Sequence, residues 1–417
     1  MRFRVHPCQW LEGEITPGGY KHASLPIIVA SLLIEEPVEL EGVPATSDVE
    51  VLCEAIQHLG GRADLRGNSL TIDSCGICNW EISRELSSRM RGTYLFMPAL
   101  ITRCGRFSVA QPGGDQIGDR TLEFGLQVMR EMGAVAENKP IMTGRAKRLT
   151  GTTLRFRDTN DLPSVTKIGL IAGSLAQGVT VLYNPFRSPE ITDLGNFLNA
   201  MGADISGTGT DTIVIVGKER LHGGRYRIMA DPLEAGTFLA ACGITGGKVT
   251  VRGVSPETMP ADLQLLERMG MDLTLGPDFV TARSTDRLCG ADFKSGPFPE
   301  MNTDVAPLFV ALAALTKGNS SFEETVWEGR WGYVRELQKM GAHITIDGQK
   351  LTIKGVEHLK GGRVTAGDLR GAAVLTLAGL ASESITEVRD AHLAFRGYER
   401  FNEKLVALGA SIEIETD

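Results

Sequence analysis

Four cationic residues lie just before or within the start of apolar segments that have the composition of buried helices. They are Lys21, Arg91, Lys167 and Arg370. A cation at a helix N-terminus opposes the helix dipole, but a bound anion there can share the unpaired backbone amides and the positive side chain. We therefore favour an anion site over solvated first turns for this set. Acidic and hydroxyl residues at similar positions are ordinary helix caps, and they are Ser164, Asp231, Asp304 and Asp368.

Three loops that precede other predicted helices carry further cations. One is the glycine-rich stretch 112–120, Pro-Gly-Gly-Asp-Gln-Ile-Gly-Asp-Arg, which ends at Arg120. The others contain Arg330 and Arg396. Glycines in the first loop suit a lid that closes over a substrate. These cations extend the predicted anion site.

The elements that must position these residues repeat six times along the chain. Each copy contains a Leu-Gly or Met-Gly pair at the end of an apolar helical pattern, with glycines at Gly60, Gly133, Gly202, Gly270, Gly341 and Gly409. A glycine at this point predicts a left-handed helix C-cap, and the alternating segment after most of them predicts a β-hairpin. A period of this length is a whole supersecondary unit, so we predict six βαβαββ modules.

Aligned modules give specific element boundaries. The predicted buried first helices span 24–33, 92–101, 168–176, 235–244, 305–315 and 371–381. The strands that follow them include 38–41, 179–183, 248–251 and 384–388.

Composition limits the class of protein. A chain of 417 residues with 42% hydrophobic content can bury more than one core, and three modules in each of two domains is the natural division. The net charge of −8 and the absence of basic runs argue against nucleic acid or an anionic membrane as partner. The N-terminus lacks an apolar signal core, so we expect a cytoplasmic protein. Cys75 and Cys78 have no further ligands nearby in sequence, and we expect free thiols and no metal.

Several motifs, in order along nearly the whole chain, resemble the UDP-N-acetylglucosamine 1-carboxyvinyltransferases. They are Gly18-Gly-Tyr-Lys21, Pro112–Arg120, Thr237-Phe238, Asn302-Thr-Asp304, Glu324–Arg330, Asp368-Leu-Arg370 and Arg396–Arg400. That family shares its fold with the 5-enolpyruvylshikimate-3-phosphate synthases. The resemblance implies an α/β (α+β) fold, a two-domain inside-out barrel of six βαβαββ repeats. One domain would hold residues 21–229, the other residues 1–20 and 230–417, with the active site in the cleft between them.

The resemblance also implies a reaction. Such enzymes move the enolpyruvyl group of phosphoenolpyruvate to an alcohol by addition and elimination, with release of phosphate and without a metal or other cofactor. By position, Lys21, Arg120 and Arg396 would hold the phosphate. Arg330 and Arg370 would hold the carboxylate, with Arg91 beside them. Planar guanidinium groups suit both anions of this small donor, and Asp231, Glu234 and Asp368 would support them.

Two carboxyl groups match the family's catalytic positions, namely Asp115 and Asp304. Most members have cysteine at the first position, as the target of the alkylating inhibitor fosfomycin, whereas this chain has Asp115. A carboxylic acid can protonate the donor's methylene carbon if burial raises its pKa. Alternatively, Asp115 only caps a turn in the loop that contains Gly113, Gly114 and Gly118.

The acceptor site departs from the family pattern. His22 and Gly329 replace asparagines that usually face the sugar, and 121–125 replaces the usual uridine-contacting stretch. The diphosphate-contacting turn falls in 160–167, with an alignment ambiguous by two residues. The expected acceptor-binding residues are His22, Arg120, Thr121, Leu122, Glu123, Phe124, Ser164, Thr166, Asp304 and Val326.

Three functions are consistent with these residues. The preferred one is transfer to the 3-hydroxyl of UDP-N-acetylglucosamine, the first committed step of peptidoglycan synthesis. The second is the same donor chemistry on another nucleotide or sugar, since a few polar changes in a pocket can alter specificity strongly. The third is a non-catalytic nucleotide-binding paralogue, which would have no use for the donor cations. We expect a monomer or a weak homo-oligomer.

Overall fold

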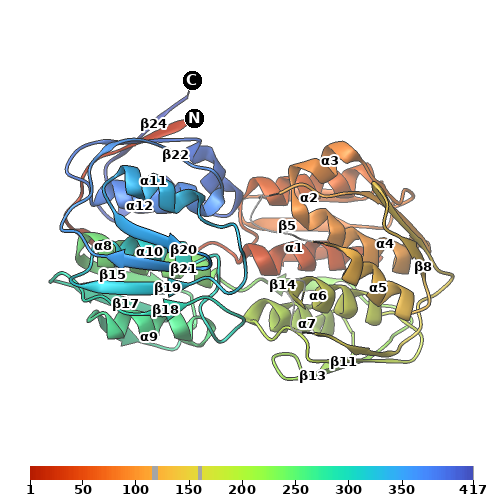
Figure 1. Ribbon diagram of the computed structural model, residues 1–417. Coiled ribbons are helices and arrows are strands. Elements are labelled where there is room, and N and C mark those ends of the chain that lie inside the picture. The colour runs from red at the N-terminus through yellow and green to blue at the C-terminus, as the bar shows by residue number, and fades with distance from the viewer. Residues whose placement is uncertain (115–120, 158–161, 417) are drawn as a thin grey trace. The chain divides into compact units, whose positions relative to one another are not determined.

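The computed structural model describes residues 1–114, 121–157 and 162–416. The chain forms two compact units (Figure 1). One comprises Met1–Gly18 and the chain from Ala230 onward, and the other comprises the described residues between Gly19 and Met229. Each unit contains three four-stranded sheets within the described residues. None of the helices in these parts of the chain has the length and apolar composition needed to span a bilayer.

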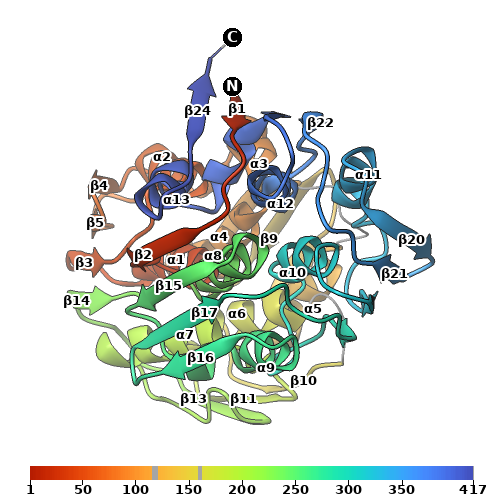
Figure 2. The same cartoon turned by 90° about the vertical axis from the view of Figure 1, so that its left-hand side faces the viewer.

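In the unit that holds both termini, the sheets lie outside three buried helices (Figure 2). In sheet order the strands are β16 (Asp272–Leu275), β17 (Phe279–Ser284), β15 (Gly247–Arg252) and β2 (Leu11–Ile15); β18 (Phe293–Lys294), β19 (Asn319–Glu323), β21 (Lys350–Lys354) and β20 (His343–Asp347); and β22 (Gly362–Thr365), β23 (Thr386–Arg389), β1 (Arg2–Val5) and β24 (Ile412–Glu415). The buried helices are α8 (Pro232–Thr245), α10 (Ala306–Ala313) and α12 (Leu369–Leu380). The others are η3 (Pro256–Thr258), α9 (Pro260–Arg268), α11 (Gly332–Lys339), η4 (Ala391–Arg396) and α13 (Phe401–Ala407).

The second unit has the same plan. Its strands in sheet order are β14 (Gly224–Arg227), β3 (Val38–Glu41), β5 (Ser69–Asp73) and β4 (Arg62–Arg66); β6 (Glu81–Ile82), β7 (Arg106–Ala110), β9 (Ile141–Arg145) and β8 (Val135–Glu137); and β10 (Thr153–Arg155), β11 (Val179–Tyr183), β13 (Thr212–Val216) and β12 (Ile205–Ser206). Its helices are α1 (Lys21–Ala30), η1 (Ser31–Leu33), α2 (Ser47–His58), α3 (Arg84–Arg89), η2 (Arg91–Leu95), α4 (Phe96–Cys104), α5 (Glu123–Glu131), α6 (Leu162–Gly173) and α7 (Pro189–Ala200).

The six-fold repeat is confirmed. All six glycines of the Leu-Gly and Met-Gly pairs have positive φ angles, between 90° and 108°. Side chains with a Cβ rarely adopt this region, which explains why glycine recurs where each second helix ends and the chain turns back. The predicted strands 38–41 and 179–183 match β3 and β11 residue for residue.

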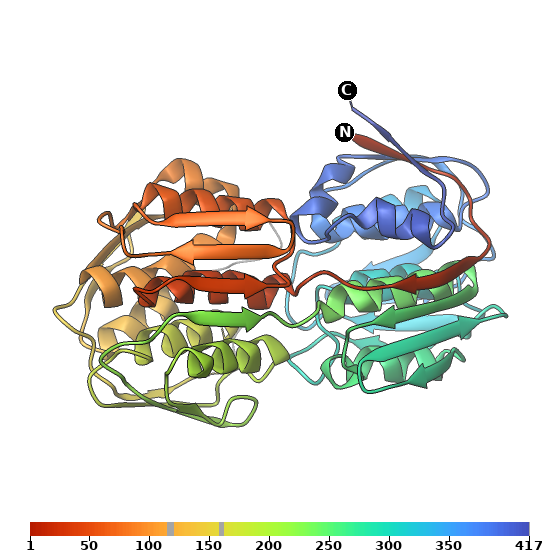
Figure 3. The ribbon, with the colours of Figure 1, turned by 180° about the vertical axis from the view of Figure 1, so that it is seen from behind.

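Two of the repeats exchange their first strands. β2 pairs in parallel with β15, and β14 pairs in parallel with β3. β1 lies between β23 and β24 and is antiparallel to both, so the N-terminal strand supplies the inner strand of the last repeat's sheet. Figure 3 shows the two ends of the chain close together at this sheet. The first strands therefore lie with the C-terminal repeats, as the resemblance implied. The chain passes from one unit to the other after Gly18 and after Met229.

The buried helices α1 and α6 begin earlier in the chain than predicted. α1 begins at Lys21 instead of Ser24, so the lysine itself opens the helix, and the N-cap Tyr20 makes no side-chain cap bond. The prediction that Lys167 and Ser164 precede a helix was wrong, because both lie inside α6, which begins at Leu162. The apolar pattern that begins at Ile168 concealed this earlier, more polar turn.

One buried carboxyl group makes stability depend on pH. Asp262 on α9 is 4% exposed, and burial raises its pKa to about 8. Because the folded-state pKa lies above the ordinary value, the protonated form favours folding below pH 4, and this stabilisation is lost as the pH rises toward 8. Asp262→Asn should therefore be more stable than the unmodified protein by on the order of 1–3 kcal/mol at pH 8 and by much less at pH 5.

Urea denaturation of both proteins at the two pH values measures this difference. Asp272→Asn, at an exposed position on β16, is the matched control and should show no pH-dependent gain. An equal gain for Asp262→Asn at pH 5 and pH 8 would show that Asp262 is not protonated in the folded protein.

Candidate active site

Asp304 joins two buried arginines. Its Oδ1 accepts a hydrogen bond of 2.7 Å from Nη1 of Arg330, and its Oδ2 accepts one of 3.1 Å from Nη2 of Arg370. The arginines are 5% and 2% exposed. The prediction that Asp304 caps a helix was wrong, since the N-cap of α10 is Val305. The backbone amide of Asp304 instead donates to the side chain of Asn302, which fixes the turn that carries the carboxylate.

The two arginines have donors left over. Nε of Arg330, and Nε and Nη1 of Arg370, are buried without a hydrogen-bond partner among the described residues. A buried donor without a partner costs about 1–3 kcal/mol, so such groups are rare unless a ligand satisfies them. Asp304 is shared by the two guanidinium groups, and the carboxyl groups of Asp368 and Asp231 also act on Arg330 and Arg370, respectively. The unpartnered nitrogens lie on planar guanidinium groups, which suit a small anion with paired oxygens.

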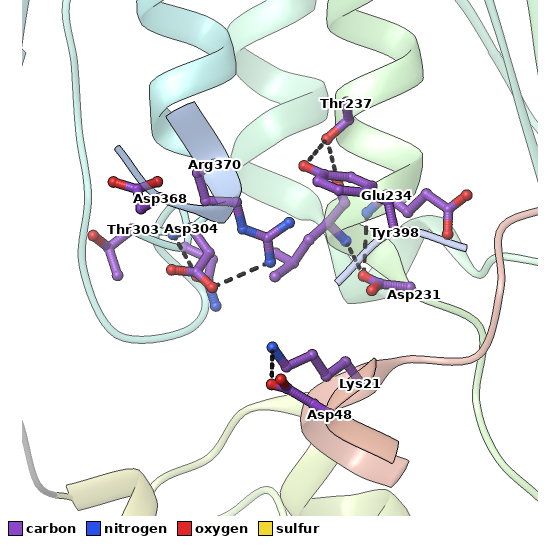
Figure 4. A network of polar contacts seen from close by, with 12 residues as sticks. Lys21, Asp48, Asp231, Glu234, Thr237, Thr303, Asp304, Asp368, Arg370 and Tyr398 are labelled. Carbon is purple, nitrogen blue, oxygen red and sulfur yellow. Dashed lines mark hydrogen bonds and ion pairs between the residues drawn. The ribbon is translucent and has the colours of Figure 1, made fainter. Parts of the chain in front are cut away.

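Arg370 is held on its other side by an aromatic ring. Its Cζ lies 5.0 Å from the ring centroid of Tyr398, whose hydroxyl is 2.9 Å from Oγ1 of Thr237 on α8 (Figure 4). Burial opposes the charge of Arg370, but Tyr398, Asp304 and Asp231 together raise its pKa above the ordinary value. The guanidinium is therefore charged at any physiological pH, and its plane is fixed by the ring and by Asp304.

Two of the predicted supporting acids are confirmed as helix caps. Asp231 accepts hydrogen bonds from the amides of Leu233 and Glu234, and Asp368 accepts one from Gly371. These bonds fix the starts of α8 and α12, and Arg370 is the second residue of α12. Burial raises the pKa of Asp231 to about 7, although Arg370 opposes the rise.

Glu234, the third supporting residue, ties chain segments together. It is fully buried, accepts a hydrogen bond of 3.0 Å from the amide of Gly18, and pairs with Lys404 on α13. Burial raises its pKa, with Lys404 acting against the rise. Glu234 therefore anchors the N-terminal segment to α8 just before the chain leaves this unit.

In the other unit, Lys21 forms a buried ion pair. Its Nζ lies 2.6 Å from Oδ2 of Asp48 on α2, and both residues are less than 10% exposed (Figure 4). His22 follows in the first turn of α1 and its ring meets that of Tyr20 edge-on. The first turn of α1 contains no acidic residue. This helix therefore begins with a cation whose partner, Asp48, comes from a different helix and not from its own first turn.

The glycine-rich loop begins against the turn that carries Arg91. Gly114 has φ of 108°, and a Cβ there would lie 3.1 Å from the Cβ of Arg91. Arg91 opens η2 and is partly buried. Asp115 and Arg120 lie outside the described residues.

The expected acceptor-binding residues differ in exposure and in the hydrogen bonds that they make. Leu122 is buried, while Phe124 is 46% exposed. Glu123 is held by Nη1 of Arg130 at 2.5 Å and by Asn138 at 3.0 Å. Thr166 is fully buried, and its hydroxyl donates to the carbonyl of Leu162 and accepts from the amide of Phe186. The structure thus gives Thr166 a packing role, and we leave it out of the proposed acceptor site.

Of the remaining predicted residues, Val326 follows β19 and Arg396 ends η4, and both are partly buried. Thr121 accepts a hydrogen bond from the amide of Glu123, and Ser164 lies on the first turn of α6. Sequence reasoning missed the contributions of Asp48, Thr303, Glu324 and Tyr398. The last three stand within or beside the quoted motifs, whereas nothing in the pattern of α2 distinguishes Asp48.

Comparison with known proteins gives consistent relatives. Residues 5–405 match the family described as EPSP synthase (3-phosphoshikimate 1-carboxyvinyltransferase). UDP-N-acetylglucosamine 1-carboxyvinyltransferases from Oleidesulfovibrio alaskensis and Coxiella burnetii are each 40% identical to this chain, over 96% of it and 96% and 93% of their own lengths.

Two solved structures of related enzymes have the same fold as this chain. The enolpyruvyl transferase NikO from Streptomyces tendae superposes with a TM-score of 0.89 at 28% identity, covering 99% of this chain and 98% of that one. EPSP synthase from Acinetobacter baumannii, at 19% identity, shares the fold with a TM-score of 0.77 over the full length of both chains.

Proposed function

Because the chain belongs to the EPSP synthase family of enolpyruvyl transferases, we propose that it transfers the enolpyruvyl group of phosphoenolpyruvate to the 3-hydroxyl of UDP-N-acetylglucosamine. The observation that carries the donor half is the pair of buried arginines beside Asp304 with unpartnered nitrogens. The acceptor half is supported by the names of the 40% identical relatives.

The residues divide the reaction between them. Arg330 and Arg370 bind the donor's carboxylate, with Arg91 beside them, and Lys21, Arg120 and Arg396 bind its phosphate. In the addition step the acceptor oxygen bonds to C2 of phosphoenolpyruvate, its proton passes to Asp304, and Asp115 protonates C3. In the elimination step Asp115 takes a proton back from C3, the bond between C2 and the phosphate oxygen breaks, and phosphate leaves with that electron pair and the proton held by Asp304. The vinyl group is thereby regenerated. Positioning and electrostatic stabilisation by fixed cations supply the rate enhancement.

The proposal requires cations from both units to bind one substrate. Lys21 and Arg91 belong to one unit, and Arg330, Arg370 and Arg396 belong to the other.

The domain limits, a cytoplasmic location, and a monomer or weak homo-oligomer stay predictions.

A different acceptor is the second candidate. His22 and Gly329 replace the family's asparagines, and Glu123 is committed to Arg130 and Asn138. The fold is also similar to that of NikO, which is described as an enolpyruvyl transferase and not as a UDP-N-acetylglucosamine 1-carboxyvinyltransferase. This similarity is consistent with a different acceptor. The donor chemistry is the same in both cases.

Phosphate release from phosphoenolpyruvate, measured over a panel of acceptors, tests the proposal. We expect release with UDP-N-acetylglucosamine and none without an acceptor. Release only with another nucleotide or sugar would favour the second candidate. If no acceptor supports release while phosphoenolpyruvate still binds, the chain is a binding protein instead.

Fosfomycin should not inactivate this protein. The drug alkylates a thiolate, and a carboxyl group at position 115 is a much poorer nucleophile. Preincubation with fosfomycin and phosphoenolpyruvate's acceptor, followed by an activity assay, should show no time-dependent loss. Asp115→Cys should become sensitive under the same conditions. Time-dependent inactivation of the unmodified protein would refute the placement of Asp115 at the acid position.

A further inference from the structure

A buried carboxylate that no catalytic step uses lies behind Asp304 and Arg330. Glu324 directly follows β19 and is 1% exposed. Its Oε1 accepts hydrogen bonds from the hydroxyl of Ser295 at 2.6 Å and from the amide of Val326 at 2.9 Å. Its Oε2 accepts one of 2.7 Å from the hydroxyl of Thr303. A buried carboxylate with this many donors is fixed in place, and it fixes the groups that donate to it.

The bond to Thr303 sets the direction of a hydroxyl group. Since the Thr303 hydroxyl donates its only proton to Glu324, its lone pairs are left to accept other hydrogen bonds. Nη1 of Arg330 lies 3.2 Å from this hydroxyl, 2.8 Å from the Thr303 carbonyl and 2.7 Å from Asp304 Oδ1. The chain of contacts thus runs from Glu324 through Thr303 to the nitrogen that also holds Asp304 (Figure 4 shows Thr303 beside Asp304).

Glu324 also holds the segment that leads to Arg330. It accepts from the amides of Val326 and, at 3.3 Å, Trp327. Ser295 reinforces this loop, because its hydroxyl accepts from the amide of Thr325 and its carbonyl accepts from the Thr325 hydroxyl. One carboxylate therefore joins three segments of the chain, around residues 295, 303 and 324–327.

We infer that Glu324 is a positioning residue for the reaction, which orients Asp304 and Arg330 through Thr303 and places Val326 through its amide. This inference rests on the proposed function. A loss of positioning moves the reacting groups by fractions of an ångström and affects the transition state more than substrate binding. Glu324→Gln retains the size of the side chain but cannot accept at every one of these contacts, since one oxygen becomes an NH₂ donor.

The test compares Glu324→Gln with Glu323→Gln. Glu323 is the adjacent residue, exposed on β19, and has no contact with the cluster beyond its backbone. We expect Glu324→Gln to lower kcat by roughly 10- to 100-fold and to raise the KM for phosphoenolpyruvate less. We also expect it to shift the pH dependence of kcat, because Arg330, which pairs with Asp304, is held less firmly by Thr303. Glu323→Gln should behave as the unmodified protein.

Variants of Thr303 test whether Glu324 acts on Arg330 and Asp304 through the Thr303 hydroxyl. Thr303→Val removes the hydroxyl and should lower kcat to a similar degree, while Thr303→Ser, which keeps the hydroxyl, should recover most of that loss. The double variant Thr303→Val with Glu324→Gln should lose little more than either alone, as expected for two members of one chain of contacts. Thermal denaturation of each variant confirms that the measured protein is folded.

The outcomes are distinct. If the unmodified protein turns over but Glu324→Gln and Glu323→Gln have the same kcat and pH profile, Glu324 has only a structural role and the inference is wrong. Additive losses in the double variant would overturn the route through Thr303. If Glu324→Gln unfolds, Thr303→Val and Thr303→Ser decide the matter alone. Absence of phosphate release by the unmodified protein counts against the proposed function instead.

Discussion

Asp304→Asn should lower kcat by about 10²- to 10⁴-fold, as loss of a group that accepts a proton in the transition state does. The asparagine keeps one oxygen for Arg330 but presents an NH₂ group toward Nη2 of Arg370, and it cannot take the acceptor's proton. The affinity for phosphoenolpyruvate should hold or improve, because the two arginines lose the only carboxylate that bridges them in the described structure. Steady-state kinetics and calorimetric titration with phosphoenolpyruvate measure the two effects separately.

Asp347→Asn is the matched control for Asp304→Asn. Asp347 is exposed in the hairpin between β20 and β21 of the same unit, so its variant should retain full activity. A kcat within threefold of normal for Asp304→Asn would remove Asp304 from the catalytic step. Weaker binding of phosphoenolpyruvate with kcat unchanged would make Asp304 a group that only shapes the donor site.

Arg370→Lys should lower kcat/KM for phosphoenolpyruvate by about 100-fold or more, through a rise in KM. Lysine keeps the positive charge but lacks the planar fork, so Nε and Nη1, the two unpartnered donors, are lost together. Charge-assisted hydrogen bonds contribute about 1.5–3 kcal/mol each, and 1.4 kcal/mol corresponds to a factor of ten. The lysine also stacks less well on Tyr398.

Arg363→Lys controls for the substitution itself. Arg363 lies on β22 with 73% of its side chain exposed, and its pairing with Glu387 at the surface contributes little. Circular dichroism and thermal denaturation should show Arg370→Lys folded. A KM for phosphoenolpyruvate unchanged from the unmodified protein would mean that Arg370 does not bind the donor.

Most of the fold could be predicted because its signals are local and repeated. The six glycines with positive φ mark the end of every second helix, and β3 and β11 match their predicted ranges. Helix starts were less predictable. The first six residues of α6 include Pro163, Ser164, Thr166 and Lys167, so the continuous apolar run begins only at Ile168 and the sequence pattern predicts a helix that starts there. The exchange of β2 and β14 came from the resemblance, since strand pairing over such separations leaves no local pattern.

The candidate site was predictable in its residue types more than in its contacts. Arg330, Arg370 and Asp304 stand in different repeats, and their spacing along the chain does not show that the carboxylate bridges both arginines. The pairing of Lys21 with Asp48 has no sequence signal at all, because Asp48 reads as an ordinary acid near a helix start. Glu324 and Thr303 belong to conspicuous motifs, but only the hydrogen bonds reveal what they hold.

A crystal structure of the protein with phosphoenolpyruvate and a candidate acceptor tests the account most directly. We predict the donor's carboxylate within hydrogen-bonding distance of Arg330 Nε and of Arg370 Nε or Nη1, its phosphate against Lys21, Arg120 and Arg396, and the acceptor hydroxyl near Asp304. Phosphoenolpyruvate bound away from Arg330 and Arg370, or Lys21 and Arg396 facing different surfaces with the donor bound, would contradict it.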